Sequence, residues 1–178
     1  MLVQSPRRGE CNAGKGFSLI ELLIVVAIIL VIAAIAVPNL VRARIAANES
    51  SAATSVRRIA TAEIAYSAAY PTVGYSPDLA SLGGPSTGCA PSSTSACMID
   101  SVLASGTKSG YQLKAVGASA SGGPNDSFVA SSAPQLFNVT GVRDFCIVTD
   151  GVLREQEGNS GGAPAADVST CMGYASAQ

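Results

Sequence analysis

Residues Leu22–Val37 read LLIVVAIILVIAAIAV, an unbroken run of sixteen apolar residues. Extending the run back to Phe17 adds only two polar residues, Ser18 and Glu21, so that 21 residues precede Pro38. A helix of that length is about 30 Å long, which matches the hydrocarbon core of a bilayer. The alternative, a helix buried in a soluble protein, would need apolar cover on every side, and the remaining residues carry too few large apolar groups to supply it. We therefore predict that this stretch spans a membrane.

A short polar leader, residues 1–16, precedes the apolar run. It contains Arg7, Arg8 and Lys15 and ends on a small residue, Gly16, immediately before the run. A secretory signal peptide would instead place its small-residue cleavage site after the apolar segment. Basic residues before a first membrane segment keep that end of the chain in the cytoplasm. We therefore predict a cytoplasmic leader, with the part of the chain beyond the membrane segment exported.

The composition of the 178-residue chain argues against most catalytic and nucleic-acid-binding functions. It has no histidine, which removes His-based triads, histidine general bases and His–Zn sites. Lysine and arginine number 11 against 12 acidic residues, so no net positive charge attracts nucleic acid. No glycine-rich phosphate-binding motif is present. We therefore predict a protein that is not an enzyme, binds no cofactor or metal ion and has no nucleic-acid partner.

The helical pattern continues beyond the apolar run. Residues 39–70 contain neither glycine nor proline and carry an apolar stripe with helical spacing. Pro38 removes a backbone donor, so we expect a kink or local unwinding there. The two segments together predict one helix of about 50 residues, about 75 Å long, with a membrane half, 17–38, and an amphipathic half, 39–70. The stripe consists of Ile45, Ala52, Val56, Ile59, Tyr66 and Tyr70.

The remainder of the chain predicts a loop followed by a small antiparallel sheet. Residues 71–110 are rich in Ser, Gly, Pro and Thr and are predicted as one long loop. Residues 111–178 contain short runs that end at turn residues, and Asp150–Gly151 between two of them is typical of a hairpin. The amphipathic half of the helix is the natural cover for one face of this sheet, so the predicted class is α+β, a long N-terminal helix packed on an antiparallel sheet, with a loop-like tail from Gly158. The predicted strands are Tyr111–Val116, Ser127–Ser131, Arg143–Val148 and Val152–Gln156.

Five cysteines are present, and four of them follow the membrane segment. On the exported side of a membrane, four cysteines are most simply two disulfides, for which three connectivities exist. We favour Cys89–Cys97 and Cys146–Cys171, the two pairs that are local in sequence. A site with four thiolate metal ligands is the alternative, but the CxxC spacing that it usually needs is absent, and a thiol nucleophile would have no histidine to activate it. The predicted role of the four cysteines is structural.

The segment Gly16–Val26, GFSLIELLIVV, closely resembles the N-terminus of type IV pilins and of type II secretion pseudopilins. The resemblance rests on a short basic leader, a glycine, a phenylalanine, a glutamate five positions in and an unbroken apolar span that ends at a proline. It is strong over residues 14–70 and looser beyond them. It implies a pilin fold, cleavage after Gly16 by an inner-membrane prepilin peptidase, and N-methylation of the new terminus, Phe17.

The same resemblance implies the location and partners of the protein. Precursor subunits would reside in the inner membrane and polymerise with copies of themselves into a helical surface filament. An inner-membrane assembly platform with a separate cytoplasmic ATPase would supply the work. The alternatives are a periplasmic pseudopilin of a type II secretion system and a minor pilin with a tip or binding role. Four exported cysteines and the lack of a compact acidic calcium loop favour the surface pilus.

Glu21 is the acidic residue within the apolar stretch. A carboxylate in hydrocarbon costs about 2.5–3.5 kcal/mol, so it needs a partner, and the span offers no cation. The resemblance implies that Glu21 of one subunit pairs with the terminal amine of Phe17 of a neighbour during assembly. The alternative is that Glu21 lies near the membrane interface and has no role. We predict Glu21 and Phe17 as assembly residues.

Overall fold

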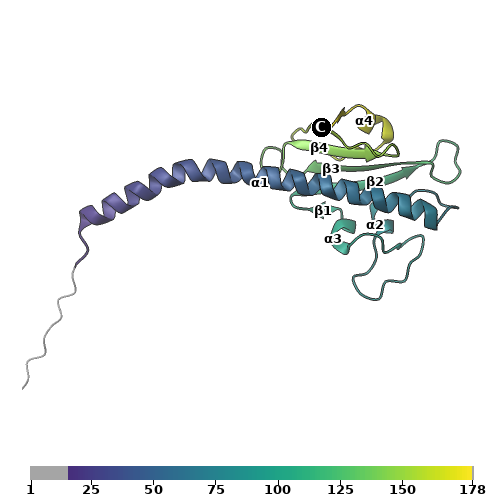
Figure 1. The fold of residues 1–178 in the computed structure, drawn as a ribbon, viewed down its shortest axis with the longest axis horizontal. Coiled ribbons are helices and arrows are strands. Elements are labelled where there is room, and N and C mark those ends of the chain that lie inside the picture. The colour runs from purple at the N-terminus through teal and green to yellow at the C-terminus, as the bar shows by residue number, and fades with distance from the viewer. Residues whose placement is uncertain (1–15, 178) are drawn as a thin grey trace, which may run out of the picture. The chain divides into compact units, whose positions relative to one another are not determined.

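The computed structural model of the protein describes residues 16–177, and the chain divides into two compact units between Asn39 and Leu40. Figure 1 labels the helices and strands along the chain. The first unit holds the start of α1 (Leu19–Ala69), and the second holds the rest of α1 and a six-stranded antiparallel sheet. Each strand pairs with the next along the chain, which confirms the predicted α+β class. The strands are β1 (Thr107–Lys108), β2 (Tyr111–Ala118), β3 (Ser127–Pro134), β4 (Arg143–Val148), β5 (Arg154–Glu157) and β6 (Ala175–Ser176).

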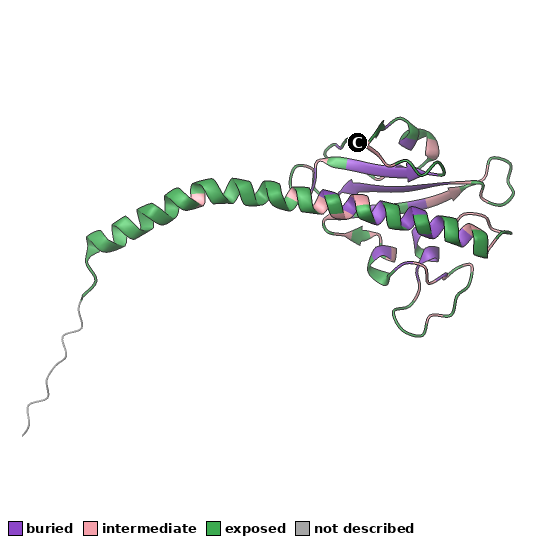
Figure 2. Cartoon of the chain, in the orientation of Figure 1, coloured by how far each residue is buried: buried purple, intermediate pink, exposed green. Residues whose placement is uncertain are grey.

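The residues of α1 change character along the helix (Figure 2). From Leu19 to Val41 the large apolar side chains are all exposed, with exposed fractions between 46% and 80%. Further along, Val56, Ile59 and Tyr66 are fully buried. The exposed part is long and apolar enough to cross a membrane. α1 therefore has an exposed apolar part and a buried part, and the predicted bounds of the membrane half stay a prediction.

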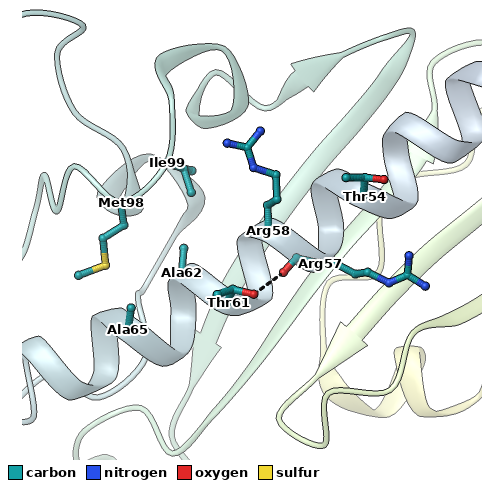
Figure 3. A pocket seen from close by; sticks show the side chains of 8 residues that line it. All are labelled: Thr54, Arg57, Arg58, Thr61, Ala62, Ala65, Met98 and Ile99. Atoms are coloured by element: carbon teal, nitrogen blue, oxygen red, sulfur yellow. Dashed lines mark hydrogen bonds between the residues drawn. The ribbon is translucent and has the colours of Figure 1, made fainter.

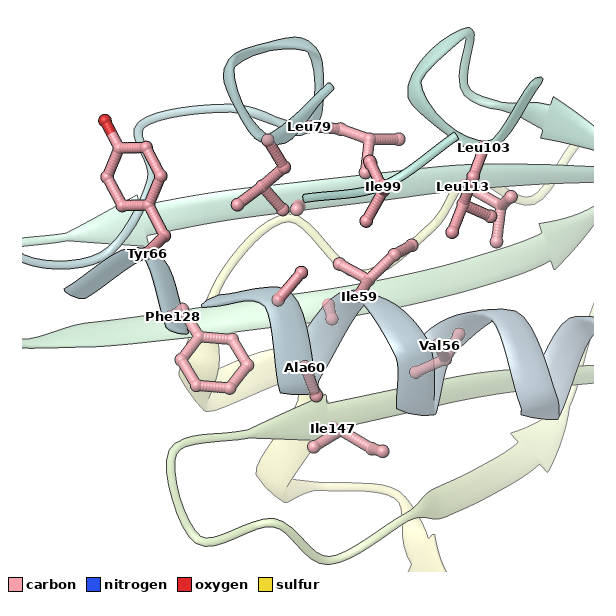
Figure 4. Close-up of a cluster of buried hydrophobic side chains, with 14 of the residues drawn as sticks. Val56, Ile59, Ala60, Tyr66, Leu79, Ile99, Leu103, Leu113, Phe128 and Ile147 are labelled. Carbon is pink, nitrogen blue, oxygen red and sulfur yellow. The ribbon is translucent and has the colours of Figure 1, made fainter. Parts of the chain in front are cut away.

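Within the second unit, the buried stripe of α1 packs on one face of the sheet (Figure 4). The strand register explains why these side chains meet. Leu113 of β2 is opposite Ser132 of β3, which is opposite Phe145 of β4, and residues directly opposite one another project from the same face of a sheet. The sheet side of this core consists of Tyr111, Leu113, Ala115, Phe128, Ala130, Phe145 and Ile147.

The opposite face of the sheet carries a second, smaller buried cluster. Val129 of β3 and Cys146 of β4 project from this face and pack with Cys171 and Tyr174 near the C-terminus. The cover comes from α4 (Val168–Met172) and the segment before it. β3 is therefore buried on both faces, which explains its nearly continuous burial from one end to the other.

The regions predicted as loops contain short elements, so those predictions were partly wrong. Residues 71–110 include α2 (Leu79–Leu82), α3 (Ser101–Ala104) and β1, and the tail after Gly158 includes α4 and β6. Each short helix begins at an aspartate whose side chain accepts a backbone N–H of the first turn. Such short helices are not stable in isolation, so packing decides their formation. The capping residues are Asp78, Asp100 and Asp167.

The predicted strands differ from the observed ones mainly at their ends. β4 has the predicted bounds, whereas β2 extends to Ala118 and β3 to Pro134. β5 begins at Arg154 instead of Val152, because Val152 belongs to the turn and donates its N–H to Asp150 Oδ1 at 3.0 Å. Gly151 takes the positive φ of 73° that this turn requires. The hairpin predicted at Asp150–Gly151 is confirmed.

Candidate functional site

The candidate processing and assembly residues lie at the start of α1. Gly16, Phe17 and Ser18 precede the helix, and Phe17 is 75% exposed. Glu21 Oε2 accepts a hydrogen bond from the backbone N–H of Ser18 at 3.1 Å. A first-turn glutamate in this position satisfies an N–H that has no partner in the helix. Its negative charge is also stabilised by the positive end of the helix dipole. The single chain thus gives Glu21 a local capping role, and the roles in cleavage, methylation and assembly stay predictions.

Pro38 lies inside α1, and the backbone is helical on both sides of it. The next residue, Asn39, donates its side-chain amide to the carbonyl of Ile35 at 3.1 Å. The carbonyl that Pro38 leaves without its usual helical donor is that of Ala34, so the bond to Ile35 is an additional contact beside it. Local unwinding is therefore not observed, and bending at Pro38 stays a prediction. Of the predicted leader, residues 1–15 lie outside the described residues.

Two disulfides fasten the second unit, and they join the two favoured pairs. Cys89–Cys97 closes a loop of the segment between α1 and the sheet over a sequence separation of 8. Cys146–Cys171 joins β4 to α4 over a separation of 25, and both of its cysteines are fully buried. In the chain-entropy model, closing a loop of that length contributes about 3 kcal/mol. The cysteines are therefore structural in this fold.

A polar clamp, formed by the buried Glu49 of α1 and the half-exposed Arg143 of β4, joins the helix to the sheet. Glu49 is only 6% exposed. Its Oε1 accepts the backbone N–H groups of Val142 at 2.9 Å and Arg143 at 3.2 Å. Its Oε2 accepts the guanidinium of Arg143 at 2.8 and 3.1 Å. These four hydrogen bonds satisfy a charge whose burial would otherwise be costly. Asn48 adds a bond from its side-chain amide to the carbonyl of Thr140 at 2.9 Å.

Sequence reasoning missed Glu49, although a signal for it exists. The apolar stripe of the helix has two steps of seven residues, from Ile45 to Ala52 and from Ile59 to Tyr66. Glu49 lies in the first gap, and Glu63 lies in the second, each at helical spacing from both neighbours. Both glutamates therefore face the sheet, and a charged residue on a buried stripe indicates a partner across the interface.

Glu63 is the second buried glutamate of α1, and its side chain is fully buried. Its Oε2 accepts the backbone N–H of Ser76 at 2.7 Å, while its Oε1 has no partner among the described residues. Burial raises the pKa of Glu63 to about 7; the bond from Ser76 opposes the rise, and the charge of Asp78 adds to it. The carboxyl group therefore titrates near neutral pH and holds the segment that follows the helix.

Glu63 is expected to make the stability of the folded unit fall as the pH rises. The folded pKa is about 7 and the reference value is 4.5, so folding takes up a proton between these pH values. The stabilising effect of the protonated form is fully present below pH 4.5 and is lost by pH 7, a difference of about 3 kcal/mol. Glu63→Gln should flatten the dependence of the unfolding free energy on pH in this window. Denaturant unfolding of both proteins across the window measures it, and equal slopes would contradict the assignment.

Residues 16–177 contain no group of three or more His, Cys, Asp or Glu side chains that could hold a metal ion. An exposed apolar helical segment with a first-turn glutamate leads into a helix that is clamped onto a disulfide-bonded antiparallel sheet. This arrangement defines a class of protein, the pilin-like α+β architecture.

The comparisons with known proteins agree with this class. Residues 11–37 match the family model described as the prokaryotic N-terminal methylation motif. A 49-residue segment, 28% of the chain, is 47% identical to the type IV major pilin protein PilA of Myxococcus xanthus, of which it covers 22%. A 36-residue segment, 20% of the chain, is 61% identical to the type IV wide pilus major component PilA4 of Thermus thermophilus, of which it covers 28%.

These matches confirm the resemblance of the N-terminal segment to the type IV pilin family. The chain spans less than a third of the length of the two curated relatives that it matches. No solved structure is a significant match to the chain. The family is therefore supported by the N-terminal motif, and the architecture of the second unit is consistent with it.

Proposed function

We propose that this chain is a structural subunit of a type IV pilus, made as an inner-membrane precursor and polymerised into a helical surface filament. The observation that carries the proposal is the exposed apolar helix from Leu19 to Val41, with Glu21 in its first turn and a matching N-terminal methylation motif. Such a helix is stable only where lipid or other apolar surface covers it. Lipid covers it before assembly, and the helices of other subunits cover it afterwards.

In this proposal a prepilin peptidase cleaves between Gly16 and Phe17, and Phe17 is then methylated at its new amino group. Residues 1–16 act as the leader, 17–38 as the membrane and filament-core segment, and the unit from Leu40 onward as the part outside the hydrocarbon. The work of extension comes from an assembly platform with a separate cytoplasmic ATPase.

The test is the intact mass of the main protein in filaments sheared from intact cells. The proposal expects a chain that starts at methylated Phe17 and is lighter by the hydrogens lost in two disulfides. Processed protein that stays in the cell envelope and is absent from sheared filaments would favour a type II secretion pseudopilin or a minor pilin instead. A mass that includes the leader would contradict processing at Gly16.

A further inference from the structure

Arg57 lies on the exposed face of α1 and has no partner for its guanidinium among residues 16–177. Three other arginines of the second unit are paired, whereas Arg42 and Arg44 form no ion pair among the described residues. Arg58 lies 3.6 Å from Asp100, and Arg143 and Arg154 each form an ion pair with a carboxylate. Figure 3 shows the side chains of Arg57 and Arg58 leaving the helix in different directions. The guanidinium of Arg57 is therefore exposed and available for a contact outside residues 16–177 of its own chain.

The surface around Arg57 is hollowed and carries accessible apolar side chains. Arg57 lines three hollows beside α1, with volumes of about 490, 460 and 240 Å³. Ala65 and Met98 lie at one of them, and Figure 3 shows Met98 on a neighbouring segment beside the helix. Ile64 and Val152, which are 57% and 42% exposed, lie at another. A cation flanked by accessible apolar surface is typical of a protein–protein contact.

The charges of the second unit are segregated in a way that suits contact between copies of the chain. Residues 40–69 carry four arginines, and their two acidic residues, Glu49 and Glu63, are buried. Residues 70–177 carry four basic and eight acidic residues. The helix face is thus positive and the remaining surface is mainly negative. Within residues 70–177, the exposed carboxylates without a cationic partner among the described residues are Asp78, Asp126, Glu157 and Asp167.

We propose that the face of α1 around Arg57 is a docking surface for a second copy of this chain, which presents an exposed carboxylate to Arg57. A two-fold contact centred on Arg57 would place Arg57 against Arg57, so the contact that we propose is heterologous, between Arg57 of one copy and a different surface of the next. Repeated heterologous contacts that do not close generate a helical polymer. The inference rests on the proposed function and adds to it the surface through which the folded units recognise one another.

Charge reversal at Arg57 tests the proposal in cells that make the full chain. Arg57→Glu is expected to reduce sheared filament protein by about tenfold or more, because the new glutamate would face the carboxylate of the neighbouring copy and repel it. Lys114→Glu is the matched control, since Lys114 is exposed on β2 and projects from the sheet face opposite the helix. Normal filaments from Arg57→Glu, or an equal loss from Lys114→Glu, would overturn the proposal.

A photo-crosslinking residue in place of Thr61 tests the contact without charge reversal, because Thr61 is exposed and lines two of the three hollows. The expected product in intact filaments is a dimer of this chain, and the same probe at Lys114 should give less of it. No dimer, or a product with another protein, would overturn the proposal even if Arg57→Glu failed to accumulate. If the unchanged protein forms no filaments at all, the proposed function as a pilus subunit is wrong. This outcome differs from a loss of the proposal alone, in which the unchanged protein still forms filaments.

Discussion

Glu49→Ala is expected to lower the free energy of unfolding by about 3 kcal/mol, among the largest effects of a single substitution in the second unit. The substitution leaves the backbone N–H groups of Val142 and Arg143 without an acceptor at the helix–sheet interface. The expected value lies at the low end for a broken buried ion pair, because the Arg143 side chain is 48% exposed and can be hydrated. Denaturant unfolding of the detergent-solubilised full chain measures the loss.

Glu155→Ala is the matched control, because Glu155 binds the same guanidinium at 3.0 Å from the other side. Glu155 accepts no backbone N–H from the interface, and its side chain is 28% exposed. We expect a loss below about 1 kcal/mol for this more exposed pair. Glu49→Gln should lie between the two, since an amide oxygen can still accept from the backbone while the charge is lost. Equal losses at Glu49 and Glu155 would show that the backbone bonds contribute little.

Glu21→Ala is expected to leave the precursor inserted and processed but to reduce sheared filaments by about tenfold or more. A tenfold change corresponds to roughly 1.4 kcal/mol, and the interaction free energy of a charge pair in a low-dielectric environment is larger than this. Insertion itself should not suffer, because removing the carboxylate removes a cost of about 2.5–3.5 kcal/mol. Filament yield, measured against the amount of processed protein in the membrane, gives the result.

Glu21→Gln distinguishes the charge of Glu21 from its capping role. A glutamine oxygen can still accept the N–H of Ser18, which Glu21 accepts at 3.1 Å, but it carries no charge. If pairing with the amine of Phe17 drives assembly, Glu21→Gln should lose filaments as completely as Glu21→Ala. Abundant filaments from Glu21→Gln would leave only the local helix cap, and the predicted pairing would be withdrawn.

Much of the fold follows from local patterns, because each pattern reports on a single element. The apolar run from Leu22, the helical stripe after Pro38 and the turn at Asp150–Gly151 each depend on a few neighbouring residues. The favoured disulfide pairs are also local, with separations of 8 and 25. Strand ends and the short helices were predicted less well, since neighbouring strands and packing decide where such elements stop.

The sequence by itself determined the exposed apolar segment with its pilin-like motif, the long helix and the antiparallel sheet. Only the tertiary structure decided which groups Glu49 and Glu63 bind, because a glutamate on a helical stripe can either point to water or be buried with a partner. The partner of Glu49 lies 94 residues away, in the first residue of β4, and no local pattern specifies a contact across that separation. The polar clamp and the titrating carboxyl group of Glu63 exist because the fold brings distant backbone and side-chain groups to two buried glutamates of α1.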